Sequence, residues 1–425
     1  MKYVTLAVVV VLAAAAALMP GSETPPPAET PPLEPPAVAV CSVVETSTRT
    51  SRVSVLSTVD WKGTLTVFAG GDGVGSVGYR TGPAGAVAID VVEVAAVGTA
   101  GALVETPVVS SAVGTVIFGT QSLAAEPCAS SPEQTTMVAG GSTTEGHSFE
   151  VQLMNPFASE AVVRLVVQSD AGLESNERFS SMVVPPLDSV TVDFTELIPG
   201  REDIAVTVEA LEGRVVAVGQ QVNDARVVQV RAVAPAQDWF LPIPAAADDR
   251  WVVIANTSDT EIEYQMDLYG PEGVEEGYEL GTLPAHAQVE VSLTPAGEQT
   301  LGVRVLATGP VVPSLWMETE TGLAATTGSA DPATRWMLPG AGAAEEGRAV
   351  LVVMNPALED VSVTVRPLRR NSEVSQYDLG AESLLELELE PAVGYLVEST
   401  GPTVVVWMAE RQGAAALAAA VPIQR

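Results

Sequence analysis

Alternating hydrophobic and polar residues mark short segments along most of the chain after residue 38. An alternation with a period of two is typical of a β-strand with one buried face, because successive side chains point to opposite sides. Helical periodicity is nearly absent. We therefore predict an all-β protein. In the best-marked stretch the predicted strands stand near 250–256, 260–269, 276–280, 287–293, 299–307, 311–319 and 322–327, with Gly or Pro between most of them.

The strand pattern repeats about every 100 residues. The segments that end in Asn155, Asn256 and Asn355 align with one another, and an alternating strand lies downstream of each. In a fourth, degenerate copy upstream, Ser57 takes the place of the Asn. Such a period fits whole domains in tandem, and short strands with turns between them favour antiparallel β-sandwiches of immunoglobulin-like type. The predicted copies cover 39–127, 128–230, 231–329 and 330–425.

The arrangement expected for such domains is a rod of four sandwiches. The main alternative is a β-propeller, but blades of about 45 residues would give half the observed period, and no such period occurs. The Ala-rich segment at 414–420 looks helical in isolation. Because it follows Gly413 as Leu323 follows Gly322, we predict that it forms the last strand of the fourth copy.

The N-terminus indicates export. Lys2 precedes an apolar run from Tyr3 to Met19, which fits either a cleaved signal peptide or an uncleaved signal anchor at 1–19. Residues 20–38 contain eight prolines and form a predicted Pro-rich linker, stiff and extended. Both alternatives place the remaining chain outside the cytoplasm, so we expect contact with the membrane only through the N-terminal segment.

Cys41 and Cys128 are the two cysteines of the chain. In an exported protein the default for such a pair is a disulfide, here closing a loop of about 90 residues around the first copy. The chain-entropy model assigns this closure about 4–5 kcal/mol. A redox-active pair is the alternative, but the Cys-x-x-Cys spacing that lowers a thiol pKa is missing.

Composition excludes several function classes. With 53 acidic and 20 basic residues the net charge is −33, which excludes binding to the phosphate backbone of nucleic acids. Two histidines cannot supply a three-His zinc site, and two cysteines cannot build a four-Cys structural site. Lysine occurs only at positions 2 and 62, which excludes a P-loop lysine and Schiff-base chemistry. We expect no metal site and no cofactor.

Motifs with catalytic associations lack their structural context. Gly73–Gly78 matches Gly-x-Gly-x-x-Gly, but the Gly- and Pro-rich residues that follow forbid the required helix, and we interpret it as a hairpin. His147 and His286 fall at different repeat positions and lack a Gly-x-Ser-x-Gly turn. Acidic pairs are abundant, and we interpret them as solvated loops. They are Asp248-Asp249, Glu275-Glu276 and Glu345-Glu346.

Four tryptophans recur between copies. Trp239 and Trp336 open the sequence Trp-x-Leu-Pro, and Trp316 and Trp407 follow a Gly-Pro pair. An aromatic residue that recurs at one place in a sandwich usually fills the core or a domain junction, so we predict that all four are structural anchors. The Asn at the end of each aligned strand is predicted to cap the following turn through its side chain.

In combination these features resemble a known family. A single N-terminal apolar segment, a Pro-rich stalk, a Cys, and copies with Trp-x-Leu-Pro before a strand ending in Asn-Pro are similar to actinobacterial exported proteins of domain-of-unknown-function family 5719. The resemblance covers most of residues 38–425, although the first copy lacks both motifs. It implies a location in the cell envelope and brings no catalytic residues.

We predict that the protein is not an enzyme but an extracytoplasmic structural or protein-interaction module, whose partner is an envelope protein. Its negative charge favours basic or cation-bridged partners. The first alternative is a module that binds wall glycan, with Trp61 and Trp251, which have no counterparts in other copies, as possible glycan contacts. The second is a glycan hydrolase, which needs two opposed carboxylates about 5–10 Å apart in a cleft.

Overall fold

The computed structural model describes residues 38–96, 98–223, 226–245, 249–319, 322–341, 347–369, 372–411 and 413–424. The predicted signal or anchor at 1–19 and almost all of the linker at 20–38 lie outside these residues. Among the described residues, no helix has the length and apolar character needed to cross a membrane. The described residues belong to one compact unit, Ala37–Arg425.

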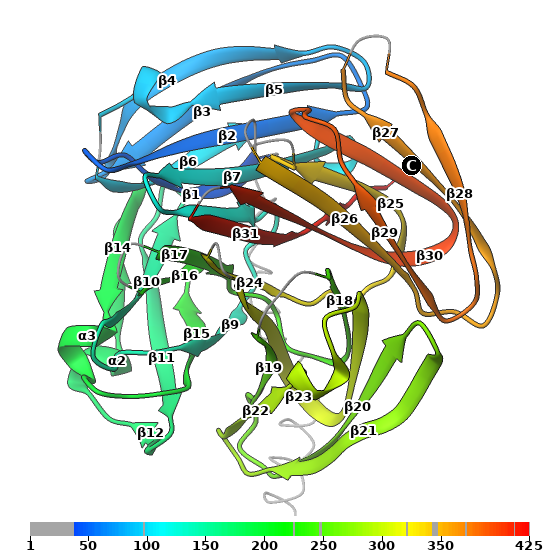
Figure 1. Cartoon of the computed structure of the whole chain (residues 1–425). Helices are drawn as coiled ribbons and strands as arrows, with labels where there is room; N and C mark the ends of the chain where they lie inside the picture. Colours follow the sequence, from blue (N-terminus) through cyan, green and yellow to red (C-terminus); the bar gives the residue numbers. More distant parts are fainter. Residues whose placement is uncertain are drawn as a thin grey trace, which may run out of the picture. The chain divides into compact units, whose positions relative to one another are not determined.

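The prediction of an all-β fold is confirmed (Figure 1). In the first repeat the strands are β1 (Val38–Val44), β2 (Arg49–Ser57), β3 (Trp61–Ala69), β4 (Asp72–Thr81), β5 (Gly85–Asp90), β6 (Thr99–Glu105), β7 (Ser111–Gly119) and β8 (Leu123–Pro127). In the second they are β9 (Thr135–Gly141), β10 (His147–Asn155), β11 (Ala161–Ser169), β12 (Gly172–Glu174), β13 (Met182–Val184), β14 (Asp188–Asp193), β15 (Ile204–Glu212), β16 (Val216–Asn223) and β17 (Arg226–Arg231).

The third and fourth repeats each contain one long strand, β23 (Leu301–Thr319) or β30 (Gly394–Arg411). In the third repeat the strands are β18 (Ala236–Ile243), β19 (Asp249–Asn256), β20 (Ile262–Gly270), β21 (Gly273–Leu283), β22 (Gln288–Ser292), β23 and β24 (Gly322–Thr327). In the fourth they are β25 (Ala333–Pro339), β26 (Gly347–Asn355), β27 (Val361–Pro367), β28 (Ser375–Leu379), β29 (Ser383–Glu388), β30, β31 (Ala414–Ala419) and β32 (Val421–Pro422). The described helices are short, namely α2 (Glu177–Ser180), α3 (Phe194–Leu197) and the 3₁₀ turns η1 (Val91–Glu93), η2 (Val108–Ser110) and η3 (Thr294–Ala296).

Each repeat places eight strand positions, which we call A to H in chain order, in two antiparallel sheets. One sheet has the order A-F-C-D and the other E-B-G-H, as in β1-β6-β3-β4 and β5-β2-β7-β8 of the first repeat. In the last two repeats one long strand, β23 or β30, supplies both F and G and so joins the two sheets. Residues 299–307 and 311–319, expected as two strands, therefore belong to one.

Apolar residues from both sheets pack face to face, which makes each repeat a sandwich. In the fourth repeat, Trp336 of β25 and Val363 of β27 share a buried cluster with Leu351 of β26 and Trp407 of β30. The alternation of apolar and polar residues in the sequence produces this packing, because every second side chain of a strand such as β11 points into the core of the sandwich.

The H strands of the four repeats, β8, β17, β24 and β31, meet. Strand β8 contacts β17 and β31, and β24 contacts the same two strands, so the contacts form a closed cycle. Figure 1 shows β17, β24 and β31 together in the middle of the repeats. The expectation of a rod is therefore wrong. Every residue of β24 (Gly-Leu-Ala-Ala-Thr-Thr) and of β31 (Ala-Ala-Ala-Leu-Ala-Ala) is buried, so each H strand needs cover that its own repeat does not supply.

The predicted disulfide is present. The sulfur atoms of Cys41 and Cys128 are 2.04 Å apart, and both residues are buried. The bond joins β1 to the residue that follows β8, so it closes nearly the whole first repeat into one loop.

Candidate functional site

The repeats meet through one face of the E-B-G-H sheet. A residue of strand B and its partner on strand G stand at the same position of this face in every repeat, and the pairs are Arg52–Val116, Glu150–Gln220, Trp251–Trp316 and Val350–Met408. In the third repeat this face lies against the second, because the Ser314 hydroxyl donates to the Ala139 carbonyl at 2.9 Å. The side chains at this position therefore decide what each junction contains.

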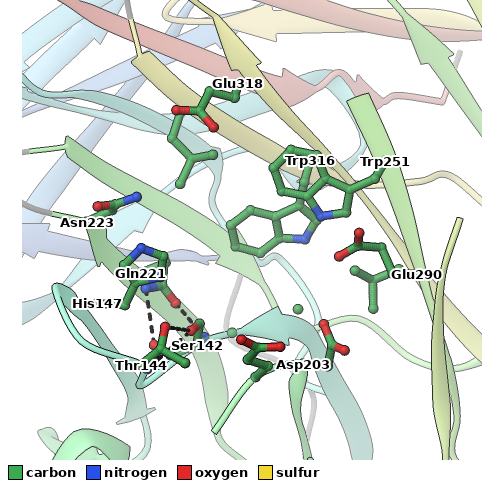
Figure 2. Close-up of a pocket in the computed structure, with 15 residues that line it drawn as sticks. Ser142, Thr144, His147, Asp203, Gln221, Asn223, Trp251, Glu290, Trp316 and Glu318 are labelled. Carbon is green, nitrogen blue, oxygen red and sulfur yellow. Dashed lines mark hydrogen bonds between the residues drawn. The ribbon is translucent and has the colours of Figure 1, made fainter. Parts of the chain in front are cut away.

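A pocket of about 260 Å³ lies at the junction of the second and third repeats, and we call it the junction pocket (Figure 2). Trp251 is half-buried and stacks on Trp316, with ring centroids 6.4 Å apart and planes 13° apart. The described lining also contains Gly140, Gly141, Ser142, Thr144, His147, Glu202, Asp203, Gln221, Asn223, Val253, Glu290, Glu318 and Leu323.

Gly140 allows Trp316 to sit at this junction. Its φ of +86° is rarely adopted by residues with a side chain, and a Cβ there would lie 2.4 Å from Trp316 Nε1. The indole is also held by a hydrogen bond, since Nε1 donates to the Ser314 hydroxyl at 2.9 Å. Both contacts fix the aromatic wall of the pocket.

The wall from the second repeat is hydrogen-bonded within itself. Gln221 Oε1 accepts from the Ser142 amide at 2.8 Å, and Gln221 Nε2 donates to the Ser142 carbonyl at 3.2 Å. The Ser142 and Thr144 hydroxyls are 2.8 Å apart. These bonds orient the loop that places His147 in the pocket lining (Figure 2).

Acidic groups from both repeats line the pocket. Burial raises the pKa of Asp203, with the negative charge of Glu202 adding to the effect, and burial raises the pKa of Glu290, with Asp203 and Glu202 adding. Glu318 differs, since Arg226 Nη1 lies 2.8 Å from its Oε1. The carboxyl groups of Glu202, Asp203 and Glu290 form no hydrogen bond or ion pair with another described residue. The described lining contains neither Lys nor Arg.

The three asparagines lie where the sequence places them. Each is fully buried at the end of strand B, and its side chain closes the following turn. Asn155 Nδ2 donates to the Ser159 carbonyl at 2.8 Å, and the same contact recurs from Asn256 and Asn355. Ser57 accepts from the Val59 amide at 3.2 Å and so performs part of this capping in the first repeat.

The four recurrent tryptophans are buried, but one predicted equivalence is wrong. Trp239 and Trp336 do correspond, because each indole N–H donates to the carbonyl three residues earlier. Trp316 pairs with Trp251 on β19. Trp407 pairs with Leu351 on β26, which is one residue after Val350, the counterpart of Trp251 in the fourth repeat. Trp407 therefore points into its own sandwich and Trp316 towards the neighbouring repeat.

The remaining candidates do not gather at one place. Trp61 lies in the first repeat, where its Nε1 donates to the Glu105 carbonyl at 3.0 Å. His286 sits in a turn with φ of +51° and bonds the exposed Asp259 at 2.7 Å. Gly73 and Gly78 lie on β4 in a hairpin with β3, as predicted. Of the acidic pairs, Glu275 and Glu276 are exposed on β21, while Asp248, Glu345 and Glu346 lie outside the described residues.

The sequence pointed to one part of the junction pocket. Trp251 was selected because no other copy has a tryptophan there, and it forms the half-exposed wall. Asp203 and Glu290 were missed, because they come from different repeats and neither belongs to an aligned motif. In the described residues, no three His, Cys, Asp or Glu side chains come together in a way that would hold a metal ion.

Comparison with known proteins gives a family and weak structural likenesses. The model of the "Family of unknown function (DUF5719)" matches residues 91–230 and 227–415. No curated protein is similar enough to count as a match. A crystal structure of Thermotoga maritima 1070 has 17% identity, a TM-score of 0.20, and matches over 22% of this chain and 94% of that chain.

Two further solved structures cover more of the chain at lower similarity. The Streptomyces avermitilis alpha-L-rhamnosidase complexed with L-rhamnose has 8% identity and a TM-score of 0.12, over 85% of this chain and 54% of that chain. A tetra-tandem repeat in the extending region of a large adhesion protein has 12% identity and a TM-score of 0.11, over 91% of this chain and 100% of that chain. Likenesses at these TM-scores carry no argument about function.

Proposed function

The chain belongs to the family of unknown function DUF5719, and we propose that it is a non-catalytic structural or protein-interaction module of the cell envelope. On this proposal it is an actinobacterial protein exported by its N-terminal segment, which either remains as a membrane anchor or is cleaved. Residues 20–38 then separate the membrane from four immunoglobulin-like repeats. The buried disulfide Cys41–Cys128 is compatible with such a location.

The observation that carries this proposal is the closed cycle of H strands. Contacts across the junctions fix the repeats to one another in addition to their apolar surfaces. Between the first and second repeats the Ser42 hydroxyl donates to Gln152 Oε1 at 2.6 Å, and between the third and fourth the Ala245 amide donates to Glu386 Oε2 at 2.8 Å. A body fixed in this way presents its loops and sheet edges in constant positions, which suits a scaffold for binding.

Co-purification from the native host tests this function. The tagged full-length chain is crosslinked in cells, and both proteins and wall glycan retained with it are identified. The proposal expects the same envelope protein in independent preparations, with the chain in the membrane or wall fraction. Retention of glycan with no reproducible protein partner would contradict it.

Glycan binding is the second candidate, and the junction pocket favours it. A half-exposed indole beside planar amide and carboxyl side chains is an arrangement that a sugar ring can use, because its faces stack and its hydroxyls donate and accept hydrogen bonds. Trp251→Ala would abolish retention on purified wall glycan if this candidate holds. Trp61→Ala is the matched control, since Trp61 lies in another repeat and outside the pocket lining. Release of reducing sugar in the same samples would instead favour a hydrolase.

A further inference from the structure

The charge of the junction pocket is not balanced within the described residues. Asp203 and Glu290 reach into it from two repeats, and the negative charge of Asp203 adds to the rise in the pKa of Glu290. Glu202 adds a third carboxyl, Arg226 is engaged with Glu318, and Arg201, which precedes Glu202, is engaged with Glu174. Carboxylates that are partly removed from water and repel one another gain most from a positive group placed between them.

The aromatic wall points to the same kind of ligand. The face of an indole attracts a cation more strongly than other aromatic side chains do, and removal of water strengthens that attraction. Trp251 is half-buried, and its orientation is fixed by stacking on Trp316. The indole face and the carboxyl groups without ion-pair partners both attract a positive charge, so the pocket has two features of a cation site.

An equivalent junction of the same chain shows this chemistry with the chain's own residues. Between the fourth and first repeats, the guanidinium carbons of Arg52 and Arg411 lie 5.2 and 5.4 Å from the ring centroid of Phe118. Arg52 Nε donates to Asp90 Oδ1 at 2.7 Å, and Arg411 Nη2 donates to the Ser122 carbonyl at 3.2 Å. Arg52 occupies the repeat position that Trp251 occupies in the third repeat.

At the other two junctions the strand B residue that corresponds to Trp251 and its partner on strand G are of other types. The pairs Glu150–Gln220 and Val350–Met408 bring no aromatic ring, and Glu150 has the nearby charge of Arg49. The junction of the second and third repeats thus combines an aromatic wall with acidic groups, while its described lining contributes no guanidinium. A cation from outside the chain would complete the arrangement seen around Phe118.

We propose that the junction pocket binds the guanidinium or ammonium group of a basic side chain on a protein partner, with Trp251 against one face of the cation and Asp203 and Glu290 as its counter-ions. The inference rests on the proposed function as a protein-interaction module and specifies the chemistry of its partner. A volume of about 260 Å³ is below the range of about 300–1,000 Å³ usual for small-molecule sites, so it suits one side chain better than an oligosaccharide.

Calorimetric titration of the full chain tests the site directly. The probe is Nα-acetyl-arginine amide, and the comparison compound is Nα-acetyl-citrulline amide, which has nearly the same shape and no charge. The proposal expects one saturable site for the arginine compound and an affinity for the citrulline compound lower by about tenfold or more. Equal binding of both compounds, or no binding of the arginine compound, overturns it.

Matched variants separate the pocket from the general negative charge of the chain. Glu290→Gln is expected to weaken binding of the arginine compound by about tenfold, since it removes a counter-ion without changing the side-chain shape. Glu275→Gln removes the same charge from an exposed position of β21 and is expected to leave binding unchanged. Equal weakening by both variants would show non-specific attraction and overturn the proposal. If Glu290→Gln unfolds more readily than wild type, Asp203→Asn takes its place.

The outcomes also separate this inference from the proposed function. If a reproducible protein partner co-purifies but the arginine compound does not bind, the cation site fails and the interaction module stands. If a neutral wall oligosaccharide binds in the pocket and loses affinity on Trp251→Leu, while the arginine compound does not bind, the cation site is overturned in favour of a glycan site.

Discussion

Glu126 is the buried acid whose ionisation should dominate the pH dependence of stability. It lies on β8 with 5% of its surface exposed, and its Oε2 has no hydrogen-bond partner among the described residues. Arg231 Nε is 3.8 Å from Oε1, too far for a hydrogen bond. Burial raises the pKa of Glu126 to about 8, and the charge and the backbone amide of Arg231 offset only part of that rise. The folded protein therefore favours the protonated acid.

The substitution Glu126→Gln measures this effect. Because the pKa of the group is about 4.5 in the unfolded chain and about 8 in the folded one, the folded state holds a proton that the unfolded state releases between these pH values. The free energy of unfolding of the wild type should therefore fall as pH rises through this window, by up to about 1.4 kcal/mol per pH unit from this group. The full loss above pH 8 amounts to roughly 5 kcal/mol, while glutamine stays neutral throughout.

Urea unfolding at pH 5, 7 and 9 provides the assay. The variant and the wild type should be close in stability at pH 5, and the variant should be the more stable at pH 9 by several kcal/mol. The physical reason is that the buried carboxylate loses its hydration and receives little in return. A variant that is less stable than the wild type at pH 9 would refute this reasoning, because it would show an ionised Glu126 that Arg231 stabilises.

Three further substitutions test the fold. Replacing Cys41 and Cys128 together by Ser should lower the free energy of unfolding by about 4–5 kcal/mol, since the disulfide joins residues 87 positions apart. Urea unfolding of the wild type and the double variant measures the difference, and a difference below about 1 kcal/mol would contradict the stabilising role of the disulfide. Asn256→Ala should cost about 2–4 kcal/mol in the same assay, because it removes the amide that donates to the buried carbonyl of Leu283 and that accepts from the Ser258 amide. A cost near zero would show that water replaces the side chain. Gly140→Ala should destabilise by about 1–3 kcal/mol more than Gly146→Ala. Both glycines have a positive φ, +86° at Gly140 and +84° at Gly146, but only Gly140 has a neighbour that a methyl group would strike. Equal costs would contradict the contact with Trp316.

The sequence was sufficient for the elements and insufficient for their assembly. Alternation and the recurring Asn locate strand B and its turn in three repeats, because both signals arise within a few residues of chain. The closed cycle depends on what covers β24 and β31, and a run of mostly small residues does not say whether the strand that covers it belongs to the same repeat or to another. The rod was expected because the pattern inside each repeat is complete without that information.

The junction pocket, too, could be predicted from the sequence only in part. Trp251 could be selected because it departs from the repeat, whereas Asp203 and Glu290 meet only when two repeats are placed together. The mistaken equivalence of Trp316 and Trp407 has a simple cause, since spacing from the Gly-Pro pair differs by one residue between the copies. One residue reverses the face of a strand, and only the pairing with strand B reveals it.

The closure of the four repeats is the central claim, and one distance tests it most directly. The amide of Gln424, after the last strand of the fourth repeat, donates to the carbonyl of Val109 in the first at 3.1 Å, and both side chains are exposed. Nitroxide labels on Val109→Cys and Gln424→Cys, measured by double electron–electron resonance in the oxidised protein, should lie within about 20 Å of each other. Repeats about 30 Å long arranged as a rod would separate the labels by roughly 80–100 Å, and a distance in that range would contradict the account.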